Sequence, residues 1–175
     1  MTWKYEQELD EEAEETRPAT EKKKWPPFVM EKTVVKNRSQ VSDTTTILKD
    51  VQVLVLLFSS YSIDNYEEYI GINRLYQKCK ERAAGAPRLE VIYVPLDRDI
   101  LEFTMALDSC HSNWWSFIPS DKVVPMLVHN YGIVEVPTVL VVRVMDGKVV
   151  SRRPRDLPHL NAWTLLNDIP TRARQ

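Results

Sequence analysis

Glycine and cysteine are both scarce in this sequence. Four glycines and two cysteines occur among its 175 residues. So few glycines leave no room for a glycine-rich loop that cradles phosphate groups. The cysteines, Cys79 and Cys110, form no Cys-x-x-Cys pair, and the three histidines are too scattered to complete a metal site with them. We therefore expect neither a metal site nor a bound cofactor.

Long apolar runs and a strong charge of one sign are also missing. The longest uninterrupted apolar run is six residues, Val53–Phe58, which is too short to cross a bilayer. Met1 is followed by charged residues instead of an apolar stretch, and this predicts no secretory signal. The formal net charge is only −2, so we expect neither nucleic acid nor a membrane as a partner.

Hydrophobic residues make up 43% of the chain, which is enough for a core in a single domain. Residues 1–24 are first acidic and then lysine-rich, and we interpret them as a disordered charged tail. The predicted domain covers residues 25–170, and residues 171–175 form a basic tail. Reduced thiols favour a cytoplasmic protein, and the three lysines Lys22–Lys24 leave a nuclear location open.

Apolar patterning predicts strands and helices that alternate along the chain. A continuous apolar run indicates a strand covered on both faces, and helical spacing indicates a buried helix stripe. The expected strands are Phe28–Lys36, Val41–Leu48, Val51–Phe58, Leu89–Val94 and Val136–Met145, with one more after the two-residue turn Asp146–Gly147. The expected helices are Tyr66–Cys79, a short one capped by Asp97 or Asp99 with Ile100, Phe103 and Leu107 buried, a turn at Met126–Tyr131, and a last one around Trp163. Residues 108–125 read as irregular.

This order of elements predicts the fold class. Strand–helix–strand passages favour parallel pairing, and the Asp146–Gly147 turn favours an antiparallel edge. We therefore predict a three-layer α/β/α fold with a mixed central sheet and an N-terminal β-hairpin extension.

Five segments resemble motifs of one protein family, in the same order and at similar spacing. They are Leu56–Ser62 (for YFSASWC), Leu89–Asp99 (for a strand followed by S-x-D-x-D), Trp114–Pro119 (for PWLALPF), Tyr131–Thr138 (for Y-x-V-x-x-I-P-T) and Asp146–Val150 (for TGKVV). Together they resemble the nucleoredoxin and tryparedoxin branch of the thioredoxin-like superfamily. The resemblance implies a thioredoxin-like fold.

The sequence departs from that family at the residues that carry its chemistry. Where the family usually has Cys-Pro-Pro-Cys, this chain has Ser62, Ile63, Asp64 and Asn65. Dithiol exchange needs a thiolate at a helix N-terminus and a second thiol to resolve the mixed disulfide. A serine hydroxyl stays protonated near neutral pH and forms no mixed disulfide. The resemblance therefore implies a redox-inactive domain with no catalytic residue at this site.

What the resemblance leaves in place is a groove for another chain. Pro137 aligns with the proline that is cis in thioredoxin folds, and Val136 before it would pair with an extended peptide. The binding residues so predicted are Tyr61, Ser62, Ile63, Asp64, Trp115, Val136 and Pro137. The expected partner is a protein or peptide client, in a regulatory or scaffolding role. The competing interpretation is that Pro137 serves only the turn and that Trp114 and Trp115 belong to the core.

Other functions stay open at this point. A protein-disulfide reductase would work through Cys110, beside His111, or through a partner's cysteine. Cys79 lies on the apolar stripe of a helix and reads as a core residue. A hydrolytic triad of Ser62, Asp64 and a histidine lacks nucleophile-elbow spacing. A third function would be interaction through the acidic tail.

Overall fold

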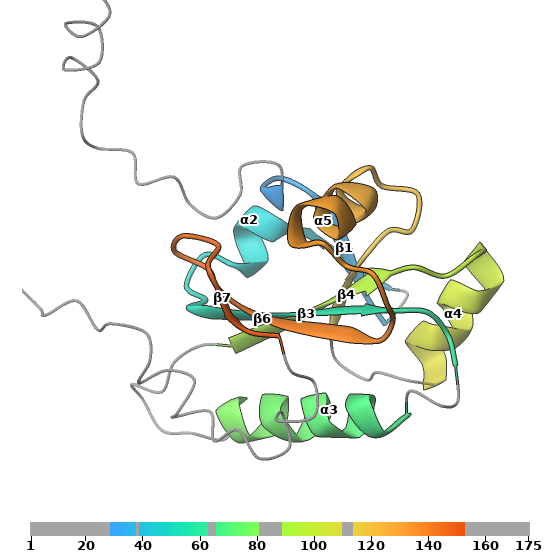
Figure 1. Ribbon diagram of the computed structural model, residues 1–175, viewed down its shortest axis with the longest axis horizontal. Coiled ribbons are helices and arrows are strands. Elements are labelled where there is room, and N and C mark those ends of the chain that lie inside the picture. Colours follow the sequence, from blue (N-terminus) through green and yellow to red (C-terminus); the bar gives the residue numbers. More distant parts are fainter. Residues whose placement is uncertain (1–28, 38, 63–65, 81–88, 110–113, 153–175) are drawn as a thin grey trace, which may run out of the picture.

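The structure is a computed structural model that describes residues 29–37, 39–62, 66–80, 89–109 and 114–152 (Figure 1). The two predicted tails and the predicted helix around Trp163 lie outside these residues. Within them, no helix is long and apolar enough to cross a membrane.

A mixed sheet forms the middle layer. Its strands are β1 (Thr33–Lys36), β2 (Gln40–Asp43), β3 (Val53–Ser59), β4 (Leu89–Pro95), β5 (Trp115–Phe117), β6 (Thr138–Arg143) and β7 (Val149–Ser151). Among the described residues their order across the sheet is β2-β1-β5-β4-β3-β6-β7. β3 and β5 pair with β4 in parallel, whereas the other neighbours are antiparallel. The predicted N-terminal hairpin, β1–β2, extends the sheet through β5.

Helices cover both faces of this sheet. They are α2 (Thr44–Ile47), α3 (Tyr66–Lys80), α4 (Ile100–Ser109) and α5 (Val123–Tyr131). α3 lies on one side of the sheet, and α2 and α5 lie on the other (Figure 1). The predicted three-layer α/β/α fold is therefore confirmed.

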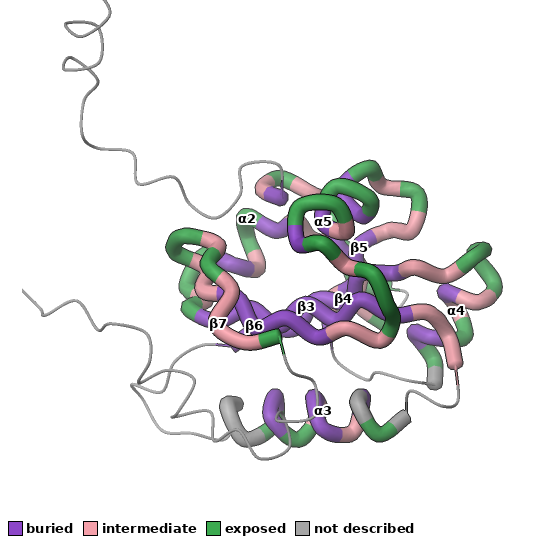
Figure 2. The backbone as a smooth tube through the Cα atoms, viewed as in Figure 1, coloured by how far each residue is buried: buried purple, intermediate pink, exposed green. Residues whose placement is uncertain are grey.

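β3 explains how the core is built. All seven of its residues are buried, as its apolar run predicts (Figure 2). Its side chains alternate between two clusters, because successive residues of a strand point to opposite faces. Val55 and Leu57 pack in the cluster beneath α3 and α4, whereas Leu54 and Leu56 pack in the cluster beneath α5.

The predicted strand Val41–Leu48 is wrong in its second half. β2 ends at Asp43, and the next four residues form α2. The Asp43 carboxylate caps this helix, since its Oδ1 accepts a hydrogen bond from the Thr46 N–H at 2.9 Å. A run of threonines favours a strand by propensity, but the local cap decides for a helical turn.

Three further features of the fold differ from the sequence prediction: the exposure of one residue and the bounds of two segments. Ile100, predicted to be buried, is 69% exposed because it begins α4 on the outer side, whereas Phe103 and Leu107 are buried as expected. The region predicted to be irregular contains β5 and the start of α5. The connection from β6 to β7 runs from residue 144 to 148 and is longer than a two-residue turn.

Candidate functional site

The segment after β3 and the proline before β6 lie at the same edge of the sheet. Phe58 pairs with Thr138, so the chain that leaves β3 passes beside Pro137. The Val136–Pro137 peptide bond is cis. Tyr61 and Ser62 lie in this segment and are half-buried. Ile63, Asp64 and Asn65 lie outside the described residues.

A carboxylate holds the segment after β3 in place. Asp97 Oδ1 accepts a hydrogen bond from the Tyr61 backbone N–H at 2.7 Å, and its Oδ2 accepts one from the Tyr93 hydroxyl at 3.0 Å. The Tyr93 hydroxyl also lies 3.1 Å from the Ser59 carbonyl oxygen. Asp97 therefore does not cap α4; Asp99 does, by accepting from the Glu102 N–H at 2.9 Å.

A second arm of this network reaches α3. The Ser59 and Tyr69 hydroxyl oxygens lie 2.9 Å apart, and both residues are fully buried. The chain around Ser59 is thereby tied to β4 on one side and to α3 on the other. The sequence does not predict Ser59, Tyr69 and Tyr93 as site residues, because each has the pattern of an ordinary strand or core position.

The surroundings of Asp97 shift the pKa of its carboxyl by two opposing effects. Burial raises the pKa of the Asp97 carboxyl above its ordinary value of 3.8. The hydrogen bonds from the Tyr61 N–H and the Tyr93 hydroxyl act against burial, because they stabilise the carboxylate. Burial is the larger effect, so the pKa stays raised.

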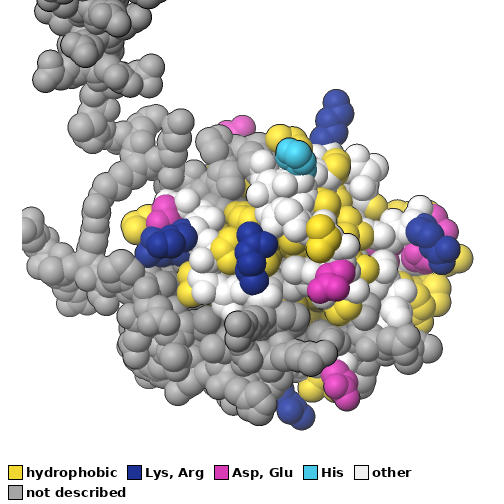
Figure 3. Space-filling model, viewed as in Figure 1, with side chains coloured by type: hydrophobic (Ala, Val, Ile, Leu, Met, Phe, Trp, Pro, Cys, Tyr) yellow, Lys and Arg dark blue, Asp and Glu magenta, His cyan; other side chains and the backbone are white. Residues whose placement is uncertain are grey.

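An apolar groove opens on the α5 side of the sheet, and Leu96, the chain neighbour of Asp97, is one of its lining residues. It has a volume of about 490 Å³, and its lining residues come from the residue after β4, from α5 and from the segment that follows α5. They are Leu96, Val124, Pro125, Val128, His129, Gly132, Ile133 and Val134. Hydrophobic side chains gather on this face over α5 and the segment after it (Figure 3).

The local sequence explains where α5, which lines the groove, begins and ends. The Asp121 carboxylate accepts from the Val123 N–H at 2.9 Å at the start of α5. Pro125 is tolerated in the first turn, where helical N–H groups have no partner within the helix. Gly132 ends α5 in the left-handed conformation, with φ of 61°. The chain then turns sharply into the residues before Pro137.

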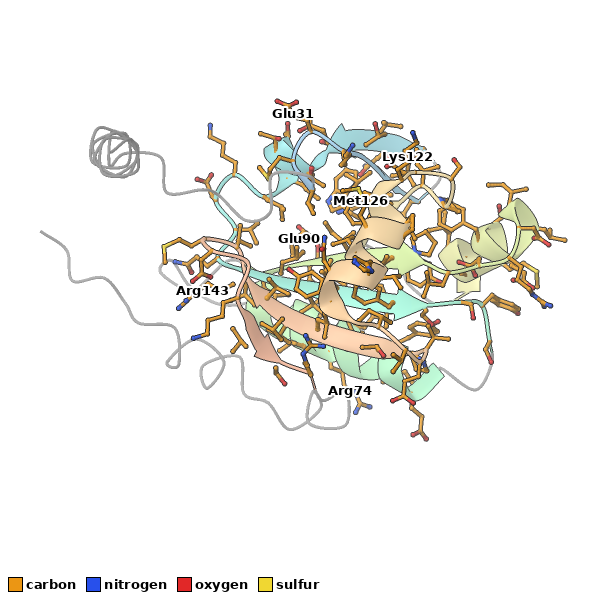
Figure 4. All side chains as sticks on the ribbon, turned by 45° about the horizontal axis from the view of Figure 1, so that its top comes forward. Glu31, Arg74, Glu90, Lys122, Met126 and Arg143 are labelled. Atoms are coloured by element: carbon orange, nitrogen blue, oxygen red, sulfur yellow. The ribbon has the colours of Figure 1, made fainter. Side chains whose placement is uncertain are left out.

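Exposed apolar side chains lie on α5 and on the segment after it, residues 134–136, which we call the rim of the groove. Val134 is 94% exposed and Val136 is 43% exposed. Met126, 42% exposed, projects from α5 (Figure 4). Glu135 stands between the two valines and is exposed as well. The rim therefore offers an alternating apolar–acidic–apolar segment to another molecule.

Trp115 is not among the residues that line this groove. Trp115 lies on β5, and β4 and β3 separate that strand from β6. Its ring lies under the Lys36 ammonium, with 4.6 Å between the nitrogen and the ring centroid. Trp114 is fully buried beneath α3, in contact distance of the Tyr69 ring. Trp115 packs against the same hydrophobic cluster as Leu96 and α5, and its place beside a bound client stays a prediction.

The remaining sequence candidates divide between described and undescribed residues. Cys110, His111 and His159 lie outside the described residues. Cys79 falls in the last turn of α3, and His129 lines the groove from α5. Among the described residues, no three His, Cys, Asp or Glu side chains are grouped so that they could hold a metal ion.

Comparisons with known proteins agree with this architecture. The model of a thioredoxin-like family matches residues 50–149, which is more than half of the chain. The protein therefore belongs to the thioredoxin-like family. A search of curated proteins by sequence finds no match.

Solved structures resemble the chain over most of its length. A thioredoxin from Wuchereria bancrofti superposes with a TM-score of 0.66 at 16% identity, covering 80% of this chain and 94% of that one. Tryparedoxin II in complex with glutathionylspermidine gives 0.60 at 15% identity, with 79% and 91% covered. Tryparedoxin I from Leishmania major gives 0.58 at 16% identity, with 81% and 92% covered. At these identities the likeness shows the fold.

Proposed function

We propose that this domain binds an extended segment of a client protein in the groove beside Pro137, without thiol–disulfide exchange. It would be a member of the nucleoredoxin and tryparedoxin branch in which Ser62 and Asn65 replace the two reactive cysteines. Its role would be regulatory or scaffolding, in the cytoplasm or nucleus. The observation that carries the proposal is the exposed apolar rim, Val134 and Val136, next to an apolar groove.

Physical chemistry supports peptide binding at this rim. An exposed apolar patch beside a groove is typical of an interaction site. A client segment that pairs with the backbone of Val136 would place alternate side chains toward the groove, as in strand addition. Burying one valine-sized side chain there contributes about 1.5 kcal/mol or more. An aliphatic or aromatic side chain of the client fits this groove best.

Selection from a displayed library of random peptides, each of about 12 residues, tests the proposal. Peptides selected on the full chain are synthesised with a fluorescent label, and their Kd is measured by anisotropy. Val134→Asp should weaken binding by about tenfold or more, because it places a charge on the apolar rim. Val41→Asp is the matched control: Val41 is 69% exposed on β2, at the far edge of the sheet. Equal losses in both variants, or no specific peptide at all, would contradict groove binding.

An insulin-reduction assay with dithiothreitol separates this proposal from a protein-disulfide reductase. We expect no turnover above the dithiothreitol background. Turnover that disappears in Cys110→Ser would establish the reductase instead. Ser62→Cys with Asn65→Cys should create measurable reductase activity, and a folded but inert double variant would contradict the equivalence of these positions with the family's cysteines.

A further inference from the structure

Pairing between β3 and β4 continues past the end of both strands, with one change of acceptor. The ladder ends where Ser59 pairs with Pro95. Beyond it, the Leu96 N–H donates to the Ser59 carbonyl oxygen at 2.8 Å. The next bond, from the Tyr61 N–H, goes to the Asp97 carboxylate at 2.7 Å. A titratable side chain thus takes the place of a backbone carbonyl at this point.

Tyr93 connects the same carboxylate to the end of β3. Its hydroxyl has one hydrogen and two acceptors: Asp97 Oδ2 at 3.0 Å and the Ser59 carbonyl at 3.1 Å. An ionised carboxylate is the stronger acceptor and attracts the hydrogen. When Asp97 takes a proton from solvent, its new O–H can donate to the Tyr93 oxygen, and the Tyr93 hydrogen turns to Ser59. The Tyr61 N–H then faces only a neutral, weaker acceptor.

We propose that the ionisation of Asp97 positions the segment Ser60–Ser62 and, through Leu96, sets the shape of the client groove. Leu96 lines the groove and is the chain neighbour of Asp97. With Asp97 ionised, Tyr61 is held against β4 and Leu96 is fixed in the groove wall. With Asp97 protonated, this tie loosens and the wall loses its support. The inference rests on the proposed function, because it concerns regulation of the same groove.

Other groups act on the Asp97 carboxylate from α4 and from the ends of β3 and β4. From α4, the Glu102 carboxylate disfavours a second negative charge at Asp97. Glu102 is itself paired with the Arg98 guanidinium at 2.7 Å, which reduces that repulsion. From β4 and the end of β3, the Tyr93 hydroxyl and the Tyr61 N–H donate to the carboxylate, and the N–H of Asp97 itself also stabilises it. Burial raises the pKa of Asp97, so the transition falls above the ordinary range of an aspartate.

Nuclear magnetic resonance of the full chain tests the positioning directly. Selective ¹⁵N-tyrosine labelling gives one amide signal for each of seven tyrosines. Added ¹³C-carbonyl labelling of serine identifies the signal of Tyr61, because Ser60–Tyr61 is the single Ser–Tyr pair in the sequence. From about pH 8 to about pH 4, the Tyr61 amide should titrate with one midpoint above 3.8, together with the Leu96 methyl groups. Asp97→Asn keeps an acceptor of the same shape and should abolish both titrations. Tyr93→Phe removes a donor to the carboxylate and should move the midpoint upward.

The wild-type titration needs no variant, so the inference can be overturned even where a variant does not fold. A Tyr61 amide that is flat over this range would overturn it. So would an equal titration in Asp97→Asn, because the signal would then report Glu102 or another group. Glu102→Gln should lower the midpoint only slightly.

Binding of a selected peptide at pH values on either side of the midpoint separates this inference from the proposed function. The expected result is about fivefold weaker binding on the acidic side, absent in Asp97→Asn. Peptide binding that does not change across a clear Tyr61 titration would overturn the coupling to the groove and leave the proposed function standing. A clear titration with no peptide binding at any pH would contradict the proposed function, while the positioning of the segment would stand.

Discussion

The Thr44 hydroxyl makes two hydrogen bonds that we expect to contribute strongly to the stability of the fold. Its hydroxyl accepts from the Lys32 N–H at 3.0 Å and donates to the Val29 carbonyl oxygen. Thr44 and Val29 are both fully buried. Thr44→Val keeps the shape of the side chain and removes both bonds. The buried Val29 carbonyl left without a partner costs about 1–3 kcal/mol, and the Lys32 N–H, which is only partly buried, costs about 1 kcal/mol, so the variant should lose roughly 2–4 kcal/mol of stability.

Urea unfolding followed by tryptophan fluorescence measures this loss, because Trp114 is fully buried in the folded state. A loss of about 3 kcal/mol corresponds to a Tm lowered by roughly 10 °C. Thr44→Ser is the control: it keeps the hydroxyl, loses one methyl group, and should cost only about 1 kcal/mol. A valine variant as stable as the wild type, or a serine variant as unstable as the valine variant, would refute the reasoning.

Three further predictions concern the site and its walls. Tyr69→Phe removes the hydrogen bond to the Ser59 hydroxyl and should lower the free energy of unfolding by about 1 kcal/mol. A double-mutant cycle with Ser59→Ala, measured by urea unfolding, should give a coupling energy of about the same size. Additive losses would show that this hydrogen bond does not contribute to stability. Gly132→Ala should cost about 1–2 kcal/mol from its positive φ alone, since no atom lies within 4 Å of the added Cβ; an unchanged Tm would contradict this. Because the pKa of Asp97 is raised, the folded state takes up its proton at a higher pH than the unfolded chain does. The free energy of unfolding of the wild type, relative to Asp97→Asn, should therefore rise as pH falls from neutral toward 3.8 and level off below. Chemical denaturation across this range measures it, and a free energy of unfolding that falls instead would contradict the prediction.

Central strands were predictable from sequence because their burial leaves a continuous signal. The apolar residues of β3 and β4 favour strands that are covered by helices on both faces, and both strands lie there. α2 could not be predicted in the same way, because its threonine run favours a strand, whereas the hydrogen bond that the Asp43 carboxylate accepts from the Thr46 N–H favours a helical turn. β5 was missed because three residues are too few to show a period.

The candidate site was predictable only where a short motif marks it. Pro137 and Tyr61 follow from their places beside recognisable strands. Asp97 does not, because its contact with Tyr61 joins residues 36 positions apart and depends on the register of two strands. Two aspartates lie close together in that stretch, and nothing in their spacing tells which one caps α4 and which one turns toward β3.

Stability alone does not explain why a carboxylate occupies the position of Asp97. Burial raises its pKa, so at neutral pH the ionised group makes the folded state less stable than an equally well bonded neutral group would. An asparagine amide has the same shape and could accept the Tyr61 N–H at the same place. What the amide cannot do is strengthen or weaken that bond with its own charge. The carboxylate therefore suits a regulatory role, in which its ionisation changes how firmly the segment Ser60–Ser62 is held. This regulation needs no thiol, and Ser62 supplies none.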